Sequence, residues 1–131
     1  MGVKMVSVTI STLDEDLYAD YGITYTDISN PEHAANAHIS ELTYWIESAM
    51  MNFKQSEGLY NTKDVGPYET TFKNKRAAKI TFSTSILGFQ VYGEIISYFD
   101  KGHLVMVMKM HENKSLLNSG DFKLIEDSIT F

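Results

Sequence analysis

A long amphipathic helix is the feature of this sequence that most constrains its fold. Apolar residues recur at steps of three and four along its middle, which is the spacing of one helical face. They are Ile39, Leu42, Ile46, Ala49 or Met50, and Phe53. Asn30 is a good N-cap, Pro31 suits a first helical position, and Gly58 is a typical stop. We therefore expect a helix over about residues 31–57, long enough to cross a small sheet.

After this helix the period of the sequence changes to two, as in half-buried strands. The alternation runs from Tyr68 to His111 and is interrupted by turn residues at Asn74-Lys75, Leu87-Gly88 and Asp100-Lys101-Gly102. The expected strands are 68–73, 77–85, 89–99 and 103–111. Because the turns are short, these strands should pair as an antiparallel meander under the helix, which is an α+β fold.

The two ends of the chain add smaller elements. Residues 3–11 alternate like a strand, Gly22 indicates a turn, and residues 23–26 fit a second short strand. Residues 59–67 are expected to be a loop holding Gly66 and Pro67. A short helix over about 121–128, with an apolar side, should dock back on the sheet and complete an α/β/α sandwich. The length of 131 residues fits a single domain over 1–131.

Composition excludes several classes of function. A net charge of −6 and a pI near 5.1 argue against nucleic-acid binding. The basic cluster of Lys73, Lys75, Arg76 and Lys79 is short and fits a solvated turn between strands. The chain has no cysteine, which excludes disulfides, thiolate metal sites and cysteine nucleophiles. We expect no transmembrane segment, since no apolar run approaches about 18 residues.

The compartment depends on the start of the chain. A native Met1 predicts a cytoplasmic protein, because the stretch from Val3 to Leu13 alternates and lacks the apolar core of a signal peptide. An export signal removed ahead of Met1 would instead predict an extracytoplasmic protein, such as a lipoprotein domain.

The order of elements and two stretches of sequence resemble the PsbP-like and Mog-like domains. The closing residues 121–131 are similar to the last helix of that family, and 88–110 is similar to its central hairpin, so the resemblance covers about 33–131. The family usually opens with an extra hairpin, for which only 3–11 and 23–26 are candidates here. The resemblance implies an α/β/α sandwich that binds proteins, as in photosystem subunits, a regulator of the Ran GTPase, lipoproteins and effector chaperones. No site residue transfers from it.

Candidate chemical groups are few. His33 and His38 are five residues apart, whereas a helical metal pair needs three or four. His103 and His111 lie about 27 Å apart on one strand. The acidic stretch Asp14, Glu15, Asp16 and Asp20 is expected to be a solvated loop, because Ala19 and Tyr25 stand where an EF-hand needs glycine and glutamate. We predict no cofactor, no metal and no catalytic motif.

Glu94 is the one carboxylate that the pattern places on a central strand, between Tyr92 and Ile96. If that face is covered, its charge needs a partner such as Lys109. An acid–base role would instead need Glu94 in a cleft beside a histidine or tyrosine.

Three functions remain open. The first is a non-catalytic protein-interaction or assembly module with an exposed apolar patch. The second is a small-molecule or lipid binder with an enclosed apolar cavity on the concave sheet face. The third is a small enzyme that uses Glu94. A homodimer through an open sheet edge is a further expectation. The candidate interaction surface consists of Trp45, Tyr92, Glu94, Ile96, Tyr98 and Lys109.

Overall fold

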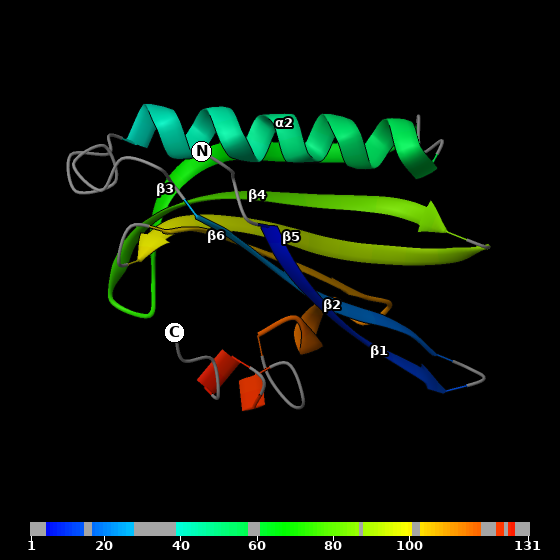
Figure 1. Ribbon diagram of the computed structural model, residues 1–131. Helices are drawn as coiled ribbons and strands as arrows, with labels where there is room; N and C mark the ends of the chain where they lie inside the picture. The colour runs from blue at the N-terminus through cyan, green and yellow to red at the C-terminus, as the bar shows by residue number, and fades with distance from the viewer. Residues whose placement is uncertain are drawn as a thin grey trace.

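The computed structural model describes residues 5–14, 17–27, 39–57, 61–86, 88–100, 103–118, 123–124 and 126–127. They form a long helix, α2, packed on a six-stranded antiparallel sheet in the order β1-β2-β6-β5-β4-β3 (Figure 1). The strands are β1 (Met5–Asp14), β2 (Leu17–Asp27), β3 (Lys63–Phe72), β4 (Lys75–Ile86), β5 (Phe89–Asp100) and β6 (His103–His111). This confirms the expected α+β class.

Helix α2 (Ile39–Glu57) buries the predicted apolar stripe on one face of the sheet. Leu42, Ile46 and Met50 are buried in a cluster with residues of β4, β5 and β6, and Phe53 stacks at 5.5 Å on Phe82. Burial of this stripe holds the helix in place, since each such side chain contributes roughly 1.5–3 kcal/mol. The predicted start at residues 31–38 and the stop at Gly58 lie outside the described residues.

The meander of β3 to β6 is confirmed, with one turn shifted. The first turn is made by Lys73 and Asn74, both at positive φ (51° and 64°), and not by Asn74-Lys75. Two left-handed residues in a two-residue loop are typical of a type I′ hairpin, whose twist matches that of the strands. Gly88, at φ 84°, lies at the second turn as predicted. Lys101 and Gly102 lie outside the described residues, between the paired Asp100 and His103.

The first hairpin is longer than the sequence suggested. The expected acidic loop and the turn at Gly22 are wrong, because Asp14 ends β1 and both Asp20 and Gly22 lie within β2. Glu15 and Asp16 lie outside the described residues. Gly22 pairs with Thr9 on one side and with Met108 on the other. A strand bonded on both sides satisfies its backbone groups, and this outweighs the local turn preference of glycine.

The predicted loop over 59–67 is also partly wrong. β3 begins at Lys63, and Gly66 and Pro67 interrupt its register with β4 between Val65 and Tyr68. Proline cannot donate to a sheet ladder, so it is confined to edge strands and bulges. β3 provides both conditions, since it is the last strand of the sheet.

The face of the sheet opposite α2 is covered by described residues of the chain that follows β6, namely 112–118, 123–124 and 126–127, which we call the C-terminal segment (Figure 1). Its Leu117 is buried with Tyr98, Val105 and Val107 in a second apolar cluster. Residues 123–124 and 126–127 are helical. The rest of 121–128 lies outside the described residues, so a continuous short helix there stays a prediction. Within the described part of the chain, no helix has the length and hydrophobicity of a membrane span.

Candidate functional site

The covered face of the sheet carries a row of polar side chains that crosses three strands. Tyr21 on β2 is directly opposite Lys109 on β6, and Lys109 is directly opposite Glu94 on β5. Tyr21 and Lys109 are fully buried, and Glu94 is 5% exposed. A lysine is almost never fully buried unless it is paired. The partners of the Lys109 ammonium therefore determine the role of this row of polar side chains.

The Lys109 ammonium contacts two carboxylates and one side-chain amide. It lies 3.2 Å from Glu94 Oε2 and 2.6 Å from Glu126 Oε1. It also donates a hydrogen bond of 2.7 Å to Asn118 Oδ1. Two of these partners, Asn118 and Glu126, belong to the C-terminal segment. Lys109 therefore fastens that segment to the sheet.

Glu94 is held from several sides. The Lys79 ammonium lies 3.1 Å from its Oε1, and Asn118 Nδ2 donates to the same oxygen at 3.3 Å. Burial by itself raises the pKa of Glu94, but the ammonium groups of Lys109 and Lys79 and the two hydrogen bonds lower it further than burial raises it. The carboxylate is therefore ionised in the folded protein. We call Lys79, Glu94, Lys109, Asn118 and Glu126 the Lys109 network.

Two tyrosines flank this network. Burial raises the pKa of Tyr21, and the Glu126 carboxylate beside it raises it further. Burial also raises the pKa of Tyr98 to about 12, with smaller contributions from Asp100 and Glu126. Both hydroxyls stay protonated at neutral pH, and neither is poised to lose a proton.

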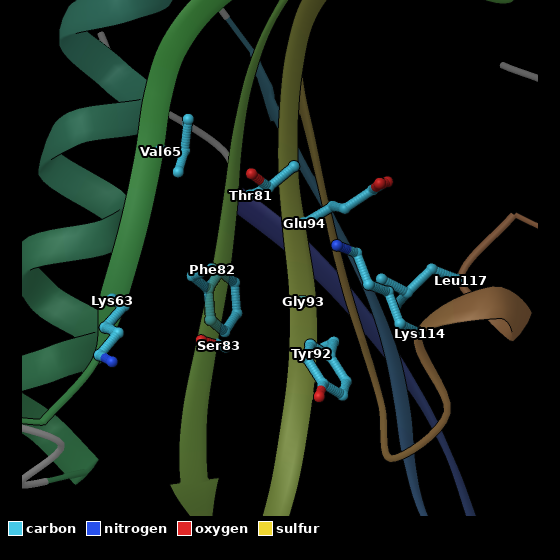
Figure 2. Close-up of a pocket in the computed structure, with 10 residues that line it drawn as sticks. All are labelled: Lys63, Val65, Thr81, Phe82, Ser83, Tyr92, Gly93, Glu94, Lys114 and Leu117. Atoms are coloured by element: carbon cyan, nitrogen blue, oxygen red, sulfur yellow. The ribbon is translucent and has the colours of Figure 1, made fainter.

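A shallow groove opens beside the Lys109 network, on the same face of the sheet (Figure 2). Its volume is about 190 Å³, which is below the roughly 300–1,000 Å³ of typical small-molecule sites. Lys63 and Val65 on β3 form one side, and Tyr92, Lys114 and Leu117 form the other, as Figure 2 shows. We call this the β3–β5 groove. Its size fits one or two side chains better than a whole ligand.

The rim of the groove is apolar and basic. Val65, which lines the groove, is 67% exposed. The Lys114 ammonium lies 6.0 Å from the centre of the Tyr92 ring, a cation–π distance. Lys63 and Lys114 have no ion-pair partner among the residues that the structure describes. An acidic chain thus presents two positive charges beside the exposed Val65.

The structure separates the six residues of the predicted interaction surface. Glu94, Ile96, Tyr98 and Lys109 are buried under the C-terminal segment, so a partner cannot contact them in this arrangement. Tyr92 is half-buried at the groove. Trp45 is 45% exposed on α2, on the other side of the sheet, where it packs edge-to-face on Tyr44 at 5.7 Å.

The remaining candidates do not gather at one place. His103 and His111 lie at opposite ends of β6, and the side chain of His111 is buried. His33 and His38 lie outside the described residues. Of the basic cluster, Lys75 pairs with Asp100 at 3.2 Å and Arg76 pairs with Glu69, as expected near a solvated turn. Lys79 differs, since it belongs to the Lys109 network.

The chemistry available to Glu94 is limited by these contacts. Its partners within the described residues are two lysines and an asparagine, and the histidine or tyrosine that proton transfer would need is not among them. A general acid must hold a proton near neutral pH, whereas the pKa of Glu94 is lowered. The geometry supports a structural ion network next to an open groove.

Sequence reasoning missed Asn118 and Glu126, which lie on the C-terminal segment. It also missed the β3–β5 groove. The sequence carries one signal that the Lys109 side chain is buried: Lys109 follows Val105 and Val107 at steps of two on an apolar face. A lysine in that position indicates a buried cation that needs acidic partners.

Comparisons with known proteins add the fold alone. No protein-family model matches this chain, and no curated protein matches it. A solved structure of PA94 from Pseudomonas aeruginosa, described as a protein of unknown function with a suggested role as a regulator, is similar in fold. It has a TM-score of 0.53 at 9% identity and covers 100% of this chain and 85% of PA94.

Proposed function

We propose that this chain is a non-catalytic protein-interaction module that binds its partner at the β3–β5 groove. One observation carries the proposal: Val65, which is 67% exposed, stands at an open hollow beside Lys63 and Lys114, and neither lysine has an ion-pair partner among the described residues. Exposed apolar surface with a polar rim is typical of protein-binding sites. The nearby ionisable groups are bound to one another in the Lys109 network, which favours binding over catalysis.

The groove indicates what the partner offers. Its volume of about 190 Å³ accommodates an apolar side chain, and Lys63 and Lys114 complement a carboxylate next to it. We therefore expect an exposed segment of a protein that carries an apolar residue flanked by aspartate or glutamate. Complementary charges of this kind mainly set specificity and association rate.

The resemblance to PsbP-like and Mog-like domains supports this proposal. That family usually opens with a hairpin before its long helix, and the β1–β2 hairpin precedes α2 here. Members of the family mostly bind proteins. The α/β/α sandwich and the short C-terminal helix are part of the same proposal, as is a homodimer formed edge to edge.

A second candidate function is the binding of a small apolar molecule. A hollow of about 320 Å³ lies between α2 and β3, lined in part by Met50, Met51, Pro67 and Ile80. Its volume falls within the range of ligand sites, but it is open to solvent, whereas ligand sites usually enclose most of the ligand. A fatty acid that raises the unfolding temperature of the wild type but not of Ile80→Lys would favour this candidate.

Site-specific photo-crosslinking tests the main proposal. A photoreactive phenylalanine analogue is placed at Val65, and in a matched control at Tyr44, which is 64% exposed on α2 across the sheet. In the native host, the Val65 variant should capture one defined protein with an acidic–apolar segment at the crosslink, and the Tyr44 variant should not. Equal capture at both sites, or none at Val65, would contradict the groove as the binding site.

A further inference from the structure

The two edge strands of the sheet differ in how well they are protected against pairing with another strand. An open edge presents unpaired backbone groups, and proteins usually blunt it with charges, proline or a bulge. β3 uses all three devices. Its register with β4 breaks between Val65 and Tyr68, it contains Pro67, and it carries Lys63, Asp64 and Glu69.

β1 at the opposite edge has none of these devices. Its register with β2 is continuous over all ten residues, from Met5 opposite Thr26 to Asp14 opposite Leu17. It contains no proline or glycine, and no charged residue stands between Met5 and Leu13. Valine, isoleucine and threonine, the residues most favoured in strands, fill five of the seven positions from 6 to 12. Within the described part of the chain, β2 is its only strand neighbour.

We propose that β1 is an interaction surface for a second copy of this chain, paired antiparallel and centred on Thr9. The two six-stranded sheets would then join into one continuous sheet across a two-fold axis. The same strand lies on both sides of such an axis, so the interface is self-complementary. This inference rests on the edge-to-edge homodimer of the proposed function and names the strand that forms it; it does not depend on the β3–β5 groove, so the two can fail separately.

The sequence of β1 fits this self-pairing. Around Thr9, Val8 would be opposite Ile10, Ser7 opposite Ser11, and Met5 opposite Leu13. Val6 would be opposite Thr12, the one mixed pair among residues 5–13, and no like charges face each other, although each chain carries a net charge of −6. In the β1–β2 pairing, Val8 and Ile10 are opposite Ile23 and Tyr21, which belong to or pack on the second apolar cluster.

The number of bonds is adequate for a dimer. Nine opposed residue pairs in an antiparallel ladder give about 8–10 main-chain hydrogen bonds, because only alternate pairs are bonded and each such pair makes two. A typical protein interface carries about 10 ± 5 direct hydrogen bonds. An acidic strand of a different protein would find no oppositely charged side chain at this edge, since residues 5–13 carry no positive charge.

The absence of cysteine allows a direct test with single-cysteine variants. Thr9→Cys places two thiols at the two-fold axis, within the 4.4–6.8 Å between Cα atoms that a disulfide needs. Thr71→Cys is the matched control, because Thr71 is an exposed threonine on the other edge strand. Under mild oxidation, Thr9→Cys should form a disulfide-linked dimer at least tenfold faster than Thr71→Cys.

Light scattering after gel filtration completes the test. The wild type should elute with twice its chain mass of 14.8 kDa, while Thr9→Lys should elute as a monomer and Thr71→Lys as a dimer. Ser11→Lys serves as a second disrupting variant, and circular dichroism shows that each variant is folded. A monomeric wild type, a dimer lost in Thr71→Lys, or cross-linking of Thr9→Cys chiefly to a different protein would overturn the proposal.

Discussion

Lys109 provides the sharpest test of how the C-terminal segment is held. Methionine at this position keeps an unbranched side chain, one atom shorter, and removes the charge. In Lys109→Met, Glu126 loses the ammonium at 2.6 Å, and Glu94 loses the one at 3.2 Å while it keeps Lys79. Breaking a buried ion pair by removing one partner costs about 3–5 kcal/mol, because it leaves an uncompensated buried charge.

This loss is large against the free energy of unfolding of an ordinary domain, which is about 5–15 kcal/mol. For a chain of this size it corresponds to a fall in the unfolding temperature of roughly 10–20 °C. Thermal and urea unfolding followed by circular dichroism would measure it. Lys123→Met is the matched control, since Lys123 pairs with Asp127 at the same distance of 2.6 Å but both side chains are more than half exposed. Exposed pairs contribute little, so the control should unfold almost as the wild type does.

A double variant separates charge from packing. In Lys109→Met/Glu126→Gln, the carboxylate that Lys109→Met leaves unpaired is neutral, so the second substitution should recover part of the loss. Coupled neighbours typically differ from additivity by about 0.5–3 kcal/mol. Additive losses, or a Lys109→Met variant as stable as Lys123→Met, would refute this account of the network.

Three further predictions follow from the same structure. The pKa of Glu94 is lowered, so the ionised carboxylate contributes stability above pH 4.5, and this contribution is lost as the pH falls below 4.5. Glu94→Gln should be less stable than the wild type at neutral pH, but it should lose less stability than the wild type during an acid titration. A Cβ at Gly93 would lie 2.2 Å from the Phe82 ring, so Gly93→Ala should cost about 1–3 kcal/mol, and an unchanged urea midpoint would contradict this packing. Burial lowers the pKa of His111 more than Glu112 raises it, and the His111 Nδ1 accepts a 2.8 Å hydrogen bond from the Asn113 N–H. NMR titration should therefore place the pKa of His111 below 6.5, and the protein should lose stability as the pH falls through that range. A titration midpoint above 6.5 would be inconsistent with a buried neutral imidazole.

The central pairing of the site could be predicted because it is local. With Asp100 opposite His103, counting back along the two strands places Glu94 directly opposite Lys109. The stripe of α2 and the alternation of the strands follow from equally short-range periodicity. Such patterns predict which side chains share a face. They predict Lys109 as a partner for Glu94 if that face is covered, and the covered face holds this pair at 3.2 Å.

The remainder of the site depends on long-range packing. Glu126 is 17 residues from Lys109 in sequence, and no turn or strand register links the two positions, so only the packing of the C-terminal segment brings them together. Asp20 and Gly22 look like turn residues, but pairing of β2 with both β1 and β6 places them in a strand. In each case a contact distant in sequence outweighs the local preference.

The affinity for the captured partner tests the central claim most directly. Isothermal titration calorimetry would compare the wild type with Val65→Asp, which places an acidic group at the groove, and with Tyr44→Asp on the opposite face. If the β3–β5 groove binds an acidic–apolar segment, the Kd should rise at least tenfold in Val65→Asp and change less than twofold in Tyr44→Asp. Equal affinities for the wild type and Val65→Asp would contradict the proposal.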